Sequence, residues 1–128
     1  MSCKIEEYRK SNGVIVPKVT LTRGDSFIAK VTALRKESGE EYQPQAGDVV
    51  RFALKRPEMT AEQKEYVDSE PRILKTIPND TLLLELQPDD TKPLPFGQYV
   101  YDIELTYASG RVDTFIEAAP FVIAQEVH

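Results

Sequence analysis

The feature that most constrains the fold is an alternation of apolar and polar side chains, which recurs along most of the chain. Residues 48–56 place Val50, Phe52 and Leu54 on one side of such a pattern. Residues 97–107 repeat it with Tyr99, Tyr101, Ile103, Leu105 and Tyr107. A period of two is typical of β-strands that bury one face, because successive side chains point to opposite sides of a sheet. The chain is therefore predicted to be all-β.

Turn residues divide the chain into about seven strands. Clusters of Gly, Pro, Asn and Asp separate the expected strands, which are 14–21, 26–35, 48–56, 73–77, 81–86, 97–107 and 112–117, with 121–123 continuing or closing the sheet. No long amphipathic helix pattern lies between them. This combination favours two packed antiparallel sheets, so we predict an immunoglobulin-like β-sandwich, with a closed barrel as the alternative.

The remaining segments fit a single domain over 1–128. A length of 128 residues is typical of one domain and is too short for two ordinary ones. We expect 1–12 to be a loose N-terminal segment. Residues 57–70 contain good helix formers but are short and polar, so we expect a surface loop or a short helix there.

A local pattern before the longest predicted strand indicates a structural corner. A Pro-Asp-Asp turn containing Asp90 precedes Gly97 and Tyr99. In immunoglobulin-like sandwiches a tyrosine at this place donates its hydroxyl to backbone a few residues upstream. Tyr101 then stands where disulfide-bearing members of that fold place cysteine. The alternative is that Tyr99 is only one of several strand tyrosines.

No set of residues is arranged for catalysis or for metal binding. His128 is the only histidine and is terminal, so nucleophilic catalysis lacks a base. Cys3 is the only cysteine, which excludes an intrachain disulfide and a zinc site with sulfur ligands. The acids of the corner at 88–95 are interpreted as turn residues, and Asp102 and Glu104 as partners of Lys or Arg across the sheet. We predict no enzyme activity, catalytic residue, metal or cofactor.

Charge and composition limit the partners. The net charge of −5 repels phosphate backbones and anionic lipids, and no basic patch offsets it. No apolar run is long enough for a secretory signal or a membrane span. We therefore expect no nucleic-acid or membrane partner, and synthesis in a cytoplasm.

Four segments together resemble small structural proteins of tailed bacteriophages and prophages. They are similar in particular to the amino-terminal β-sandwich domain of phage baseplate upper proteins, and they run over residues 21–27, 47–55, 97–105 and 110–115. In sequence these are LTRGDSF, GDVVRFALK, GQYVYDIEL and GRVDTF. The matching features are turn-and-strand signatures and contain no active-site residue.

The resemblance implies a non-catalytic virion module of the baseplate, tail or another substructure. Its partners would be other phage structural proteins and further copies of itself, and it would pass from the bacterial host cytoplasm into the virion. A sheet protein without an active site offers edges and faces for such contacts. The alternative function is a carbohydrate- or other ligand-binding sandwich, for which Tyr42, Tyr66 and Tyr107 would supply the surface. The absence of Trp weakens that alternative.

Overall fold

The structure is a computed structural model that describes residues 3–33, 40–59, 65–67 and 70–125. Over these residues the chain forms ten strands and one short helix. The elements are β1 (Cys3–Arg9), β2 (Ile15–Thr22), β3 (Phe27–Lys30), β4 (Val49–Lys55), β5 (Pro57–Met59), β6 (Glu65–Val67), β7 (Ile73–Ile77), β8 (Leu83–Leu86), α1 (Pro88–Thr91), β9 (Gly97–Thr106) and β10 (Val112–Ala124). The predicted all-β class is confirmed.

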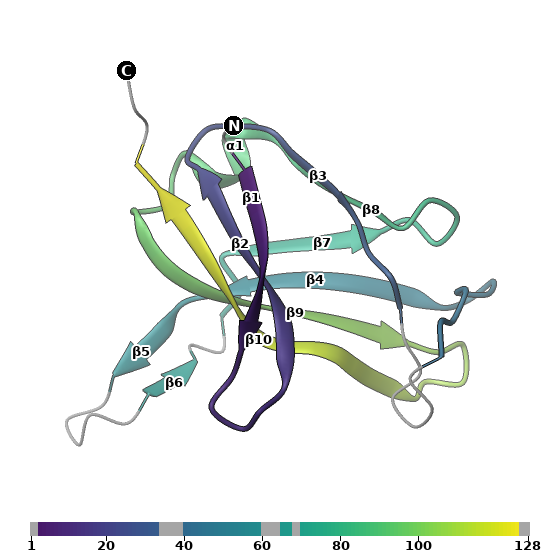
Figure 1. Cartoon of the computed structure of the whole chain (residues 1–128). Coiled ribbons are helices and arrows are strands. Elements are labelled where there is room, and N and C mark those ends of the chain that lie inside the picture. Colours follow the sequence, from purple (N-terminus) through teal and green to yellow (C-terminus); the bar gives the residue numbers. More distant parts are fainter. Residues whose placement is uncertain (1–2, 34–39, 60–64, 68–69, 126–128) are drawn as a thin grey trace.

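Two sheets form the sandwich. The larger sheet has six strands in the order β1-β2-β10-β9-β4-β7, and β3 pairs with β8 in a smaller sheet of two. The sheets are separate rather than joined into a closed barrel, and β5 and β6 form a further two-stranded hairpin. Figure 1 shows β1 and β2 running crosswise to β4 and β7, so the large sheet is strongly twisted. The predicted sandwich is confirmed. Its two sheets together have eight strands, one more than the seven expected, and the β5–β6 hairpin is additional.

The strand order follows that of an immunoglobulin-like sandwich. The neighbours β10, β9 and β4 correspond to the G, F and C strands of that fold, and the β3–β8 pair corresponds to B and E. One pairing departs from the predicted antiparallel arrangement, because β2 runs parallel to β10, with Val19 opposite Phe121 and Thr22 opposite Ala124. The first part of the chain therefore belongs to the large sheet.

The N-terminal segment expected to be loose contains a regular strand. All seven residues of β1 pair with β2, and Ile5 lies opposite Val19 and Tyr8 opposite Val16. The expectation was wrong because β1 is an edge strand with a neighbour on one side. Such a strand accommodates many charged residues, since a few apolar side chains suffice for its packing against the sheet. Residues 1–2 lie outside the described residues.

The segment 57–70 also differs from expectation. Pro57 pairs with Val67 and Met59 with Glu65, so the described parts of this segment form a β-hairpin rather than a loop or helix. Residues 60–64 and 68–69 lie outside the described residues. Cross-strand pairing overrides the weak helix preference of a short polar sequence, since an isolated helix of this length is marginal in water.

The core lies between the two sheets. Its centre is an aromatic cluster in which the ring of Phe121 packs 6.2 Å from Phe52, 6.0 Å from Tyr101 and 6.3 Å from Phe27. Phe52 and Phe121 are fully buried. Because Phe27 belongs to the small sheet and the other three to the large one, this cluster fastens the two layers together.

Candidate functional site

The corner before β9 is a structural device. The Tyr99 hydroxyl donates a 2.7 Å hydrogen bond to the Pro95 carbonyl, four residues upstream, as expected of such a corner. Gly97 has a φ of 140°, which favours glycine, and begins β9. Burial raises the pKa of Tyr99, because the charged phenolate is disfavoured away from water.

Asp90 fixes the other end of this corner. Its carboxylate accepts a 2.7 Å hydrogen bond from the Gln87 backbone N–H and lies 3.0 Å from the Lys75 ammonium on β7. The short helix α1 is thus tied to the edge of the large sheet. The side chains of Tyr99 and Asp90 thus make their polar contacts within the chain, at the connection between β8 and β9.

Tyr101 occupies the point where β2 leaves β10. The two strands pair only over Val19–Thr22 and Phe121–Ala124, so the earlier part of β2 has no β10 neighbour. There the Tyr101 hydroxyl donates a 2.6 Å hydrogen bond to the Pro17 carbonyl. Burial raises the pKa of Tyr101 to about 12. This tyrosine therefore supplies the hydrogen bond that a neighbouring strand would otherwise provide.

The divergence of β2 and β10 coincides with a bulge in β10. The register of β10 against β9 shifts between Ile116 and Ala119, and Ala118 takes a φ of 48°. Asp102 holds the bulge, because one carboxylate oxygen accepts a 2.7 Å bond from the Ala118 N–H and the other lies 3.2 Å from the Lys55 ammonium. The ion pair of Asp102 with a cation across the sheet is the interaction that the sequence predicted.

An apolar opening lies between the diverging strands. It has a volume of about 540 Å³ and reaches the aromatic core, with Ile15 and Phe115 among its lining residues. The Lys10 ammonium, in the turn between β1 and β2, donates a 2.8 Å hydrogen bond to the Glu117 carbonyl and so ties this turn to β10. The lining is mainly apolar and includes three charged residues, Lys10, Lys30 and Glu117.

The tyrosines predicted as a ligand surface do not form an open platform. The rings of Tyr42 and Tyr107 lie 5.5 Å apart in an edge-to-face arrangement and pack against the core. The Arg111 guanidinium lies 5.5 Å from the centre of the Tyr107 ring. The side chain of Tyr66 lies outside the described residues. Sugar stacking needs an accessible flat ring face, whereas Tyr42 and Tyr107 are partly buried and the Arg111 guanidinium lies over the Tyr107 ring.

Asp48 is the polar residue that the sequence did not reveal. It is 7% exposed, and its carboxylate accepts hydrogen bonds from the Tyr42 hydroxyl at 2.7 Å, the Gln45 N–H at 2.8 Å and the Ala108 N–H at 2.9 Å. The Tyr42 hydroxyl and these N–H groups hold the pKa of Asp48 below its usual value. The sequence indicates a turn at Gly47-Asp48 before β4, but it does not indicate that the Asp48 carboxylate binds the distant Ala108 N–H.

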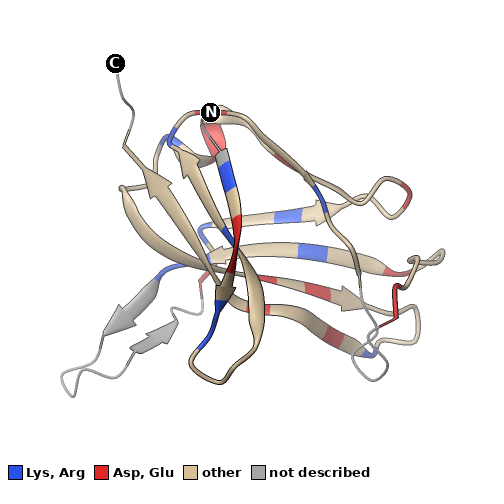
Figure 2. Cartoon of the chain, in the orientation of Figure 1, with Lys and Arg blue, Asp and Glu red and all other residues tan. Residues whose placement is uncertain are grey.

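The exposed outer edge of β1 is the most distinctive surface of the molecule. β1 ends the large sheet, and within the described part of the chain no strand pairs with its outer side. Ile5 is 51% exposed and Tyr8 is 41% exposed, although both belong to a regular strand. Figure 2 shows acidic and basic residues following one another along β1. This edge combines free backbone groups, apolar side chains and charges of both signs.

The fold and these surfaces define a class of protein, an all-β sandwich with an open edge. Within the described residues no group of three or more His, Cys, Asp or Glu side chains could hold a metal ion. No described helix is long and apolar enough to cross a membrane. No family model matches the chain, and no significant match was found among the curated proteins or the solved structures.

Proposed function

We propose that the chain is a non-catalytic structural protein of a tailed phage or prophage that works through protein–protein contacts. The observation that carries the proposal is the open edge of β1, a regular strand whose outer backbone groups have no strand partner among the described residues. The similarity of four strand-and-turn segments to baseplate upper proteins supports the virion context. Partner subunits would be other phage structural proteins and further copies of the chain.

An open regular edge is a costly feature for a protein that acts alone. Natural sheets blunt their edges with prolines, bulges or very short strands, because an unpaired edge invites pairing with another chain. β1 has no proline and no bulge, and its seven pairs with β2 are in unbroken register. Charged side chains also protect edges, and those of β1 carry both signs, so a partner edge of complementary charge can still pair with it. Such an edge is suited to an assembly module that is covered by a neighbour in the finished particle.

The polar groups inside the fold are consistent with a structural role. Among the described residues, every buried side-chain nitrogen or oxygen has a hydrogen-bond partner. Tyr99, Tyr101, Asp48 and Asp102 all bond to backbone groups within the chain. Buried polar groups that are all committed to the scaffold leave the surface as the functional part.

The proposal is tested by locating the protein in particles. We expect mass spectrometry to find the chain at a stoichiometric level in phage-like particles purified from an induced culture of the host strain. Deleting the gene should yield defective particles, and a plasmid copy should restore them. A chain that stays wholly in the non-particle fraction, with deletion leaving the particles intact, would contradict the proposal.

A further inference from the structure

The end of β1 carries a charge sequence that is inverted about one residue. Two acids, Glu6 and Glu7, precede Tyr8, and two bases, Arg9 and Lys10, follow it. In an antiparallel pair of identical strands, residues equally far before and after the symmetry centre lie opposite one another. A centre at Tyr8 therefore places acids opposite bases on both sides.

The hydrogen bonds of the hairpin show which backbone groups of β1 face outward. Lys10 donates its N–H to the Val14 carbonyl of the returning strand, so its backbone points toward β2. Inward and outward residues alternate along an antiparallel strand, so Glu6 and Tyr8 also point inward and Glu7 and Arg9 point outward. The Pro17 carbonyl supports this assignment. It accepts its hydrogen bond from Tyr101 and so points away from β1, and Glu7, which lies opposite Pro17, therefore has its backbone groups directed away from β2.

We propose that β1 pairs with β1 of a second copy of the chain, antiparallel and about a two-fold axis at Tyr8. Glu7 of each copy then lies opposite Arg9 of the other, and these residues are the ones whose backbone N–H and C=O point outward. Each such pair can exchange two backbone hydrogen bonds, and its side chains form an ion pair on the same face. The two large sheets join into one continuous sheet across the dimer.

Other registers are less favourable for identical chains. A two-fold axis between two residues sets an outward-facing residue opposite an inward-facing one and breaks the ladder. An axis at Glu6 or Glu7 places that glutamate directly opposite itself, and like charges in this position are destabilising. An axis at Ile5 keeps the ladder but sets only Lys4 opposite Glu6 on each side of the centre. The axis at Tyr8 sets two acids opposite two bases on each side, and one of these unlike pairs, Glu7 with Arg9, is made by the outward residues.

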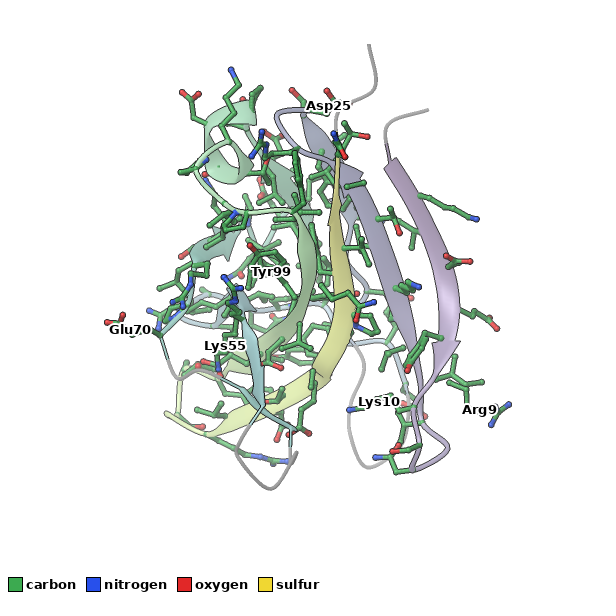
Figure 3. The ribbon with its side chains drawn as sticks, turned by 90° about the vertical axis from the view of Figure 1, so that its left-hand side faces the viewer. Arg9, Lys10, Asp25, Lys55, Glu70 and Tyr99 are labelled. Carbon is green, nitrogen blue, oxygen red and sulfur yellow. The ribbon has the colours of Figure 1, made fainter. Side chains whose placement is uncertain are left out.

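The side chains are placed to allow this contact. Figure 3 shows the Arg9 side chain pointing away from the body of the molecule beyond β1. Tyr8 is 41% exposed and lies on the proposed axis, where the two copies of its ring would cover one another. Lys10 bonds to the Glu117 carbonyl of β10, whereas Arg9 donates one exposed 3.3 Å hydrogen bond to the Gly13 carbonyl of its own hairpin. A guanidinium has five N–H donors, so Arg9 keeps donors for a partner, and we assign the specificity of pairing to Glu7 and Arg9. The inference deepens the proposed function by naming the partner and the surface.

Sedimentation velocity of the full chain over a range of concentrations tests the pairing. We expect the wild type to dimerise reversibly. The reversals Glu7→Arg and Arg9→Glu each place two like-charge pairs in the dimer and should weaken it by about tenfold or more. The double variant E7R/R9E restores unlike pairs and should dimerise like the wild type. E85R, which reverses an exposed charge on β8, is the matched control and should change nothing.

Mixing the two single variants separates pairing from misfolding. A copy with Arg at positions 7 and 9 faces a copy with Glu at both, so the mixture should form a heterodimer although each variant alone stays mostly monomeric. A monomeric wild type, a dimer indifferent to the reversals, or a double variant that fails to recover would each overturn the pairing. A chain found in particles but monomeric overturns this inference alone, whereas a charge-dependent dimer absent from particles overturns the proposed function alone.

Discussion

At the residue scale, single polar side chains hold together segments that the strands leave apart. The carboxylate of Asp48 binds the Tyr42 hydroxyl and the N–H groups of Gln45 and Ala108. It thereby fastens the turn before β4 to the turn between β9 and β10. A hydrogen bond to a charged group contributes about 1.5 to 3 kcal/mol to stability. Losing this carboxylate should therefore destabilise the end of the sandwich where the two turns meet.

We predict that Asp48 makes stability depend on acid pH. Its pKa lies below the ordinary 3.8 in the folded state, so the unfolded chain binds the proton more readily. The stabilisation is therefore full above the unfolded pKa and is lost as the pH falls through the folded pKa. We expect D48N to unfold with about 2 to 3 kcal/mol less free energy than wild type at neutral pH. The difference should shrink on acidification.

Urea denaturation at several pH values measures this difference. D89N is the matched control, because Asp89 is an exposed acid in α1, and its stability should follow the wild type at every pH. If the difference in free energy of unfolding between D48N and wild type stayed constant down to the lowest pH measured, the ionised carboxylate of Asp48 would not be the source of the stabilisation.

The two kinds of polar contact also show what a sequence can reveal. The corner at Tyr99 was predictable because its acceptor, Pro95, is four residues away and both ends lie in one local pattern. The Asp48–Ala108 bond joins residues sixty positions apart, and Tyr101 reaches Pro17 over an even longer interval. Such pairs depend on which strands become neighbours, and local alternation does not determine strand order.

At the scale of elements, the sequence identified the well-patterned strands and missed the irregular ones. The sequence pattern ends a predicted strand at residue 117 and resumes at 121, whereas β10 runs through this interval as one strand of thirteen residues with a bulge. The Asp102 carboxylate replaces the lost ladder contact by accepting from the Ala118 N–H. β1 and the β5–β6 hairpin were missed for a related reason, since pairing with a neighbour decides their state more than composition does.

The bulge leads to a prediction about Ala118. Its φ of 48° is unfavourable for any residue with a Cβ atom, and glycine removes that cost. Glycine also gains entropy in the unfolded chain, which offsets part of the benefit. We expect A118G to raise the free energy of unfolding by about 0.5 to 1 kcal/mol.

Leu82 is the matched control for this backbone effect. It has a similar φ of 54°, but its side chain is only 4% exposed. L82G should therefore lose about 3 kcal/mol through the cavity it leaves, despite the same relief of backbone strain. Thermal and urea unfolding of both variants measure the contrast, and an A118G protein less stable than wild type would argue against strain at the bulge.

At the scale of the whole molecule, the large sheet has a protected centre and an open side. β9 lies between β10 and β4, and its Tyr99, Tyr101, Ile103 and Leu105 side chains are buried. Among the described residues β1 has a strand neighbour on one side only, and Figure 3 shows this purple strand at the outer margin of the large sheet. Local opening requires less free energy at such an edge than in the centre, so amide exchange should differ between the two strands.

Within β1 itself, exchange should alternate and should respond to concentration. The N–H groups of Glu6 and Tyr8 face β2 and should be protected at every concentration, whereas those of Glu7 and Arg9 face outward and should exchange quickly in dilute solution. If two copies pair about Tyr8, the outward amides acquire acceptors in the partner and should slow as the protein is concentrated. In E7R, which opposes like charges, they should stay fast at concentrations where the wild type is protected. Hydrogen exchange followed by NMR measures each amide, with Ile103 of β9 as the slow reference. Unchanged exchange at Glu7 and Arg9 in a concentrated sample that sediments as a dimer would place the interface elsewhere, because an edge pairing must cover these two groups first.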